Sequence, residues 1–133
     1  MRLDLEWPRP PSILSQSSMR RATKADPIGV DELRQLAAGR FVDMVKAVVD
    51  LQREVIMLDA DMHSDQEAEL LSEGADQKDL WGINLYPGLS GEDFIEFDSM
   101  INLRPSCSNR SRGVDDSATR AAIARLVDRM VAR

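Results

Sequence analysis

The sequence has little of several features that define common protein classes. Its 133 residues include one cysteine and one histidine, and only 5% of them are aromatic. A single cysteine excludes an intramolecular disulfide and is typical of a reducing compartment, so we expect a cytoplasmic protein. No apolar run approaches the roughly 20 residues that a membrane-spanning helix needs. The first residues contain no apolar segment of signal-peptide length, so secretion is not expected.

Common cofactor and metal motifs are also absent. The chain contains no GxGxxG, GxxxxGK[ST], HExxH or CxxC pattern, so nothing in it supports a nucleotide, zincin or zinc-finger site. No metal ligand set is predicted, and the sequence indicates no particular cofactor. Cys107 lies in a polar stretch with no readable base nearby, and we interpret it as an ordinary loop residue rather than a nucleophile.

Charge is abundant but unevenly distributed. The formal net charge is -6, from 17 basic and 23 acidic side chains. Residues 1–40 carry seven basic and five acidic side chains, residues 41–99 three and fifteen, and residues 100–133 seven and three. The acidic balance argues against general nucleic-acid binding, which needs a net cationic face. The seven cations of the last segment are all arginines, so a local anion site is compatible with the sequence.

The length of the chain suits one domain with one core. A content of 43% apolar and 30% charged residues is typical of a soluble globular protein. Residues 1–25 differ, because they are rich in proline and serine and lack apolar periodicity. We predict that residues 1–25 form a disordered tail and residues 26–133 a single domain. Met19 lies within the tail and is a second candidate for the initiating residue.

Two helices are predicted near the start of the domain. The first spans residues 30–38, with Gly29 at its N-cap and Gly39 just beyond its end. Residues 41–58 then carry apolar side chains at i, i+3, i+4 and i+7 spacing among many good helix formers, which favours a second helix. The alternation of valines in the same segment also suits a β-hairpin, which is the alternative.

Two later segments carry helix signals of unequal strength. Residues 63–74 hold Ser64 and Glu67 at capping-box spacing, which favours a helix, although a strand leading into a turn stays open. Asp116 or Ser117 is expected to cap a C-terminal amphipathic helix. Its apolar stripe consists of Ile123, Leu126, Val127, Met130 and Val131. The apolar side of this helix leaves a homodimer open.

The clearest strand signals are two alternating segments joined by turn residues. Residues 80–86 and 94–104 alternate apolar and polar side chains, and the connection PGLSGED favours a hairpin between them. In the predicted register Asn84 faces Glu96, the even-numbered side chains share a polar face, and Trp81 belongs to the core. The resulting fold class is α+β: a small antiparallel sheet packed with two N-terminal helices and a C-terminal amphipathic helix.

His63, Asp65 and Glu67 form the first candidate site. On a strand, their alternate spacing would place an imidazole and two carboxylates on one face, which suits acid–base catalysis. On a helix, His63 and Glu67 are i, i+4 neighbours and Asp65 points away. The competing interpretation is a capping box beside a solvated acidic face, because one histidine and two acids often meet by chance in an acidic segment.

A second candidate site gathers the polar residues Asn102, Arg104, Asn109, Arg110 and Ser111. They lie at a predicted strand end and in the loop that follows, where a rigid scaffold often presents binding groups. Arginine offers a fork of donors that matches a carboxylate or phosphate, and asparagine and serine add neutral donors. These residues predict a site for an anionic ligand, unless Arg104 pairs with Asp98 or Glu96 on its own strand.

The motifs that contain both candidate sites resemble those of a prokaryotic family of small proteins classified as a domain of unknown function. Members run roughly LHADxEAxLL, DGSxQxD[IL]WG, SLINIRP and, in a loop, NxS. The matching segments here are MHSDQEAELL at 62–71, EGADQKDLWG at 73–82, SMINLRP at 99–105 and NRS at 109–111. The resemblance covers about residues 28–133. It implies that the residues of both candidate sites, except Arg110, lie at positions that define the family, but it carries no activity or substrate.

The sequence departs from the family pattern at two places. Leu58-Asp59-Ala60-Asp61 stands where members place glycines before the histidine, and Ser64 replaces an alanine. The first departure affects the expected geometry of the turn that precedes His63. Neither departure removes a candidate polar group.

Two functions follow from these candidates, and the sequence does not decide between them. The leading hypothesis is a binding or regulatory domain, whose anionic small-molecule ligand or protein partner contacts the Arg104 loop. The alternative is a small hydrolase or nuclease-like, toxin-type enzyme, in which His63 is the general acid or base, Asp65 and Glu67 orient it or hold a metal, and Arg104 stabilises negative charge. Convergence of His63 and Arg104 in one open pocket would favour the enzyme.

Overall fold

The structure is a computed structural model that describes residues 19–133. In chain order its elements, with 3₁₀ turns written η, are β2 (Arg20–Ala22), β3 (Ile28–Gly29), α2 (Val30–Arg40), β4 (Val45–Asp50), β5 (Val55–Leu58), α3 (His63–Ser72), η1 (Gln77–Asp79), β6 (Leu80–Leu85), η2 (Gly91–Phe94), β7 (Ile95–Glu96), η3 (Met100–Asn102), η4 (Pro105–Cys107), α4 (Ser117–Met130) and β8 (Val131–Ala132). Within residues 19–133 they make an α+β fold of three helices, a five-stranded antiparallel sheet and a two-stranded parallel pair.

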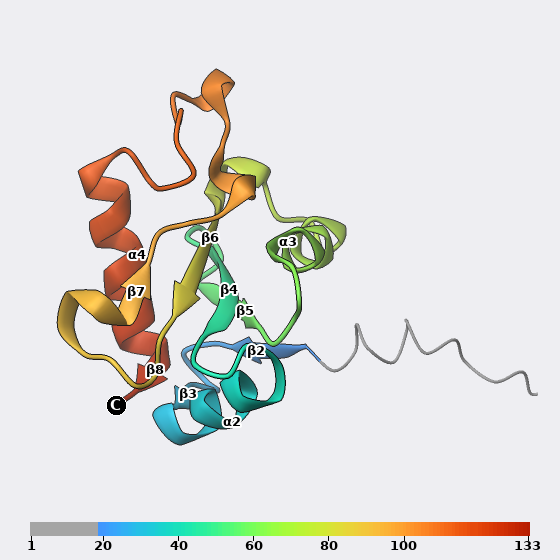
Figure 1. Ribbon diagram of the computed structural model, residues 1–133. Coiled ribbons are helices and arrows are strands. Elements are labelled where there is room, and N and C mark those ends of the chain that lie inside the picture. Colours follow the sequence, from blue (N-terminus) through green and yellow to red (C-terminus); the bar gives the residue numbers. More distant parts are fainter. Residues whose placement is uncertain (1–18) are drawn as a thin grey trace, which may run out of the picture.

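The main sheet has the strand order β2-β5-β4-β6-β7, with every neighbouring pair antiparallel (Figure 1). Its centre is the pairing of β4 with β6, which runs from Val45 opposite Leu85 to Asp50 opposite Leu80. The separate pair of β3 and β8 is parallel. This pair joins the start of α2 to the end of α4.

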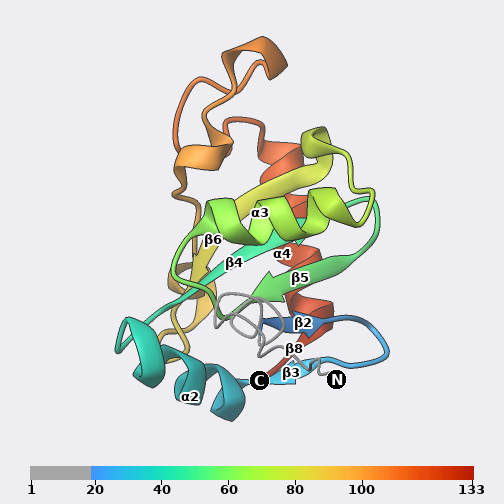
Figure 2. The ribbon, with the colours of Figure 1, turned by 90° about the vertical axis from the view of Figure 1, so that its right-hand side faces the viewer.

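Helices cover both faces of the sheet, α3 on one and α4 on the other (Figure 2). Neighbouring residues of a strand point to opposite faces, so β4 contributes Ala47 to the core under α4 and Val48 to the core under α3. In the larger core, Ile123 and Leu126 of α4 pack with the sheet. The smaller core consists of Val48, Met57, Leu70 and Leu80.

Residues 41–58 contain the hairpin of β4 and β5, so the predicted second helix is wrong and the alternative is right. Val48 and Val49 are both fully buried, on opposite sides of the sheet, whereas a helix buries one stripe. Asp50 holds the turn, because its Oδ1 accepts two backbone N–H groups, both at 3.1 Å. Strand pairing on both sides therefore outweighs local helix propensity. Within the described residues α2 is the one N-terminal helix, instead of the two predicted.

The other predicted helices are present with shifted ends. α2 runs through Gly39, which we expected beyond its end. α3 begins at His63, and its N-cap is Met62, which supplies no side-chain hydrogen bond, so the predicted capping box at Ser64 is wrong. α4 is capped by Asp116 as predicted, through a hydrogen bond of 2.9 Å to a backbone N–H of the first turn.

The predicted strand over 94–104 is present only at its start, since β7 keeps two residues. Its register is right, because Asn84 lies opposite Glu96. Beyond Glu96 the chain leaves the sheet, and Asn102 turns inward to a fully buried position. Alternation therefore no longer decides which side chains face the core. Trp81 is half-buried against the larger core.

β2 lies within the segment that we predicted to be a tail. Its Ala22 is fully buried, and Arg20 pairs with Glu32 of α2 at 2.9 Å, so the sheet includes residues before the predicted boundary. The rest of the predicted tail, residues 1–18, lies outside the described residues. None of the helices in residues 19–133 is long and apolar enough to cross a membrane.

Candidate functional site

Arg104 joins two segments of the chain through backbone carbonyls. Its guanidinium donates hydrogen bonds to the carbonyl oxygens of Gln77 and Leu80, the latter at 2.8 Å. It also lies over the ring of Trp81, 4.4 Å from the centroid. Among the described residues it pairs with no carboxylate, so the alternative interpretation, an ion pair with Asp98 or Glu96, is wrong. Arg104 is 9% exposed, and a nearly buried arginine bonded in this way stabilises the fold.

Asn102 ties the η3 turn to β6. Its Oδ1 accepts the N–H of Gly82 at 2.8 Å, and its Nδ2 donates to the carbonyl oxygens of Gly82 and Arg112, both at 2.9 Å. Only glycine fits at position 82, because a Cβ there would lie 2.5 Å from Ser99 Cβ and 3.2 Å from His63 Cγ. Close packing of this turn against β6 therefore explains the glycine.

Asn109 organises the loop that precedes α4. Its Nδ2 donates to three carbonyl oxygens, at 2.8, 3.1 and 2.8 Å. The Ser111 hydroxyl donates to Asp115, which also accepts the backbone N–H of Arg110. The anion site expected at this loop stays a prediction. Its geometry does not favour it, since Asn102 and Asn109 use their donors inside the protein. Arg104 donates from two of its nitrogens to backbone carbonyls, and its buried Nε has no partner among residues 19–133.

α3 separates the residues of the first candidate site. His63 faces the sheet and is 7% exposed, with its Nε2 2.7 Å from the Ile83 carbonyl oxygen of β6. Asp65 is exposed, and Glu67 accepts a side-chain hydrogen bond at 3.2 Å. Arg104 is not part of the pocket that His63 lines. The convergence that would favour an enzyme is therefore not found among residues 19–133.

Burial lowers the pKa of His63 below its usual value, and the charge of Lys46 acts in the same direction. The hydrogen bond to Ile83, the charge of Asp98 and the side chain of Asn84 oppose this effect. A carbonyl oxygen only accepts, so Nε2 of the neutral ring carries the proton and donates it to Ile83. The other ring nitrogen, Nδ1, is left as an acceptor.

His63 lies at the wall of a cavity of about 470 Å³, here named the polar pocket. The cavity lies beside the first turn of α3. Its lining residues are Met44, Lys46, Asp61, Met62, His63, Ser64, Asn84, Tyr86, Glu96, Asp98, Ser99, Met100, Ile101 and Arg112. Two of its carboxylates are paired with arginines, Asp61 with Arg40 at 2.7 Å and Asp98 with Arg112 at 2.7 Å.

A cation, an amide and an anion form one row across the pocket. Lys46 of β4 lies opposite Asn84 of β6, and Asn84 lies opposite Glu96 of β7. Residues opposite each other on adjacent strands share a face and are about 5 Å apart. Asn84 Nδ2 donates to Glu96 Oε1 at 2.9 Å. Lys46 lies over the ring of Phe41, 5.3 Å from the centroid, and pairs with no carboxylate among residues 19–133.

Polar groups at the pocket lack hydrogen-bond partners. Asn84 is 4% exposed, and its Oδ1 accepts no hydrogen bond from residues 19–133. An unsatisfied buried group of this kind costs about 1–3 kcal/mol. The start of α3 has no side-chain cap. The N–H of Asp65 donates to the Met62 carbonyl, so the N–H groups of His63 and Ser64 are the ones available, and they carry a partial positive charge. The pocket thus holds both unused donors and unused acceptors.

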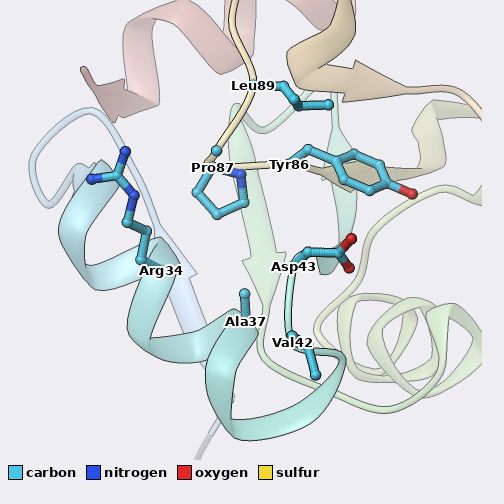
Figure 3. Close-up of a pocket in the computed structure, with 8 residues that line it drawn as sticks. Arg34, Ala37, Val42, Asp43, Tyr86, Pro87 and Leu89 are labelled. Carbon is cyan, nitrogen blue, oxygen red and sulfur yellow. The ribbon is translucent and has the colours of Figure 1, made fainter.

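A second cavity of about 470 Å³ adjoins the polar pocket, and Tyr86 lines both. This apolar pocket is lined by Arg34, Ala37, Val42, Asp43, Tyr86, Pro87, Gly88 and Leu89 (Figure 3). The Tyr86 hydroxyl donates to Glu96 Oε1 at 3.0 Å. Burial raises the pKa of Tyr86, and the bond to Glu96 acts in the same direction, so the hydroxyl remains a donor near neutral pH.

Sequence reasoning missed the polar pocket for a definable reason. The apolar spacing of residues 41–58 favours a helix, and in a helix Lys46 would not lie beside Asn84. The predicted register of Asn84 with Glu96 was the available signal, but it described two of the three strands.

Cys107 is exposed. Within residues 19–133, no group of three or more His, Cys, Asp or Glu side chains is placed to hold a metal ion.

Comparison with known proteins agrees with the resemblance of the motifs. The model of a family described as "Protein of unknown function (DUF5674)" matches residues 23–130. No curated protein and no solved structure matches the chain. The matched range includes both candidate sites and both pockets.

Proposed function

The chain belongs to the DUF5674 family, and because that description names no activity, we propose from the geometry that the domain binds a small zwitterion in the polar pocket. The ligand carries an anionic group and a nearby ammonium group, as a free α-amino acid does. The observation that carries this proposal is the row of Lys46, Asn84 and Glu96 beside the uncapped start of α3.

The anionic group of the ligand is received by Lys46 and the first turn of α3. Lys46 has no carboxylate partner among residues 19–133, so its charge is free for a ligand. Backbone N–H groups at a helix start favour an anion through hydrogen bonds and the helix dipole. The helix α3 has ten residues and is therefore long enough to have a helix dipole of this kind. Both features lie in the lining of one pocket.

The ammonium group of the ligand is received by acceptors on the other side of the row. Glu96 Oε1 accepts only neutral donors, from Asn84 and Tyr86, so its negative charge is not compensated by a cation among the described residues. Asn84 Oδ1 lacks a donor, and the neutral ring of His63 adds an acceptor. A ligand with a positive group would supply the missing partner.

The proposal keeps the binding hypothesis that the sequence suggested and moves the site. The Arg104 loop has few free donors, whereas the polar pocket has several. An enzymatic function has no comparable support, because Asp65 points away from His63 on α3 and Glu67, one turn further along, accepts a hydrogen bond from Gln77.

Isothermal titration calorimetry and thermal denaturation with glycine, acetate and methylamine test the proposal. Glycine combines both charged groups, and the other two probes carry one each. We expect glycine to bind more tightly than either and to raise the melting temperature. At about ten times the dissociation constant the ligand adds about 1.4 kcal/mol to stability, or roughly 3–8 °C.

Variants locate the site. We expect Lys46→Met and Glu96→Gln each to weaken glycine binding by about 10-fold or more, since each removes a charge-assisted contact. Lys24→Met and Glu92→Gln change exposed residues of the same types outside the polar pocket and should leave binding unchanged. The proposal is wrong if glycine has no effect, or if the control variants weaken binding as much as the pocket variants.

A further inference from the structure

Val42 has a backbone conformation that a valine normally avoids. Its φ is 75°, in the left-handed region, where a β-branched residue is a clear outlier. Its N–H donates to the Ala37 carbonyl at 2.7 Å, just beyond the end of α2. Glycine or asparagine is the usual residue at this place after a helix. The conformation costs about 1–3 kcal/mol.

Burial of the Val42 side chain does not offset the cost of this conformation, because the residue is 80% exposed. Its side chain instead forms part of the wall of the apolar pocket, together with Leu89, which is 51% exposed (Figure 3). Met62 and Met100, also exposed, line the polar pocket. Exposed large apolar residues thus gather around two cavities that share Tyr86 as a lining residue, which is typical of a ligand site.

We infer that the apolar pocket receives the aliphatic side chain of the zwitterion, so that the ligand is an aliphatic α-amino acid or a molecule of that chemistry. This inference rests on the proposed function, because the polar pocket would hold the charged groups. Tyr86 lines both pockets, and its hydroxyl donates to Glu96 of the polar pocket. An aliphatic chain bound at Glu96 would pass along this ring.

Size and chemistry agree with one amphiphilic small molecule. Each cavity measures about 470 Å³, and small-molecule sites commonly enclose about 300–1,000 Å³. The walls contributed by Ala37, Val42, Pro87 and Leu89 are apolar, and Arg34 and Asp43 also line this pocket. The polar pocket contains Lys46 and Glu96, which have no ion-pair partner among residues 19–133. Strain retained at Val42 keeps an apolar side chain at the rim, where it would contact the chain of the ligand.

A homologous series of ligands tests the inference. Glycine, 2-aminobutanoate, norvaline and norleucine have the same charged groups and differ in chain length. We expect the association constant, measured by calorimetry with the full chain, to rise about three- to fourfold for each methylene that enters the pocket. The increase is expected to stop when the chain outgrows the cavity.

Two variants remove the apolar walls without touching the charged row. Val42→Asn places a residue that tolerates positive φ, so it should raise the melting temperature while reducing the gain per methylene. Leu89→Ser should reduce that gain as well, and Leu71→Ser, at an exposed leucine outside both pockets, serves as the control. Glycine affinity should stay the same in all three.

The outcomes separate the two proposals. Glycine binding with no dependence on chain length would overturn the apolar subsite and leave the zwitterion site intact. A dependence on chain length that persists in Val42→Asn and Leu89→Ser would place the chain elsewhere and would also overturn the inference. No binding by any member of the series would overturn both proposals.

Discussion

At the residue scale, His63 is the only histidine of the chain, and its position makes stability depend on pH. Its ring is nearly buried and its pKa is lowered, chiefly by burial. The unfolded chain has an ordinary histidine pKa of about 6.5. As the pH falls through that value, the unfolded state takes up a proton before the folded state does, so folding becomes less favourable.

We therefore expect the free energy of unfolding to decrease from about pH 7.5 to pH 5.5, by at most about 1.4 kcal/mol per pH unit. The decrease ends once the pH is below the folded-state pKa. Urea unfolding across this range measures it. His63→Gln can still donate to Ile83 but does not titrate, and it should remove the dependence on pH. Equal pH profiles for the two proteins would contradict this account.

At the element scale, the turns between β7 and α4 are held by a few buried polar side chains. Asn102 bonds both backbone groups of Gly82, and Arg104 reaches the carbonyls before and at the start of β6. These bonds take the place of the long strand that the alternation predicted. Asparagine and arginine therefore explain why a mostly irregular segment has a defined position.

We expect Arg104→Lys to reduce the free energy of unfolding by about 1–3 kcal/mol. A lysine cannot donate to two carbonyls in the fork geometry, nor can it stack in the same way on Trp81. Chemical denaturation measures the loss, and Arg110→Lys, at an exposed residue of the same loop, should change little. If Arg104→Lys has no larger effect than Arg110→Lys, the bonds to β6 do not stabilise the loop.

At the scale of the whole molecule, the sheet is covered on both faces and its edge strand β2 comes from the N-terminal part of the chain. Ala22 of β2 is fully buried, and Arg20 and Arg21 form ion pairs with Glu32 and Glu73. The sheet thus contains residues that composition alone assigned to a tail.

Two truncated chains test the extent of the domain. A chain that begins at Met19 keeps β2, and we expect it to have the melting temperature of the full chain. A chain that begins at Lys24 lacks β2, and we expect it to lose at least about 1 kcal/mol of stability through lost burial and ion pairing. Thermal denaturation measures both. Equal melting temperatures for the two truncated chains would show that β2 contributes little.

Local signals in the sequence were sufficient where a segment's own pattern decides its structure. The helices α2 and α4, the strand β6 and the register of Asn84 with Glu96 were predictable, because apolar spacing and, for α4, the cap at Asp116 act over a few positions. The helix α3 was predicted from a capping box that the structure does not contain. The family was likewise recognisable from short motifs. The two candidate sites were read from the same motifs, and the structure shows most of their buried members bonded to backbone groups.

The hairpin of β4 and β5 and both pockets depended on contacts between segments distant in the chain. The valines of β4 suit either a helix or a strand, and pairing with β5 and β6 makes the difference. The row of Lys46, Asn84 and Glu96 comes from three strands, so no spacing within one segment contains it. Residue patterns act locally, whereas a binding site is assembled by strand order and register, which only the folded chain possesses.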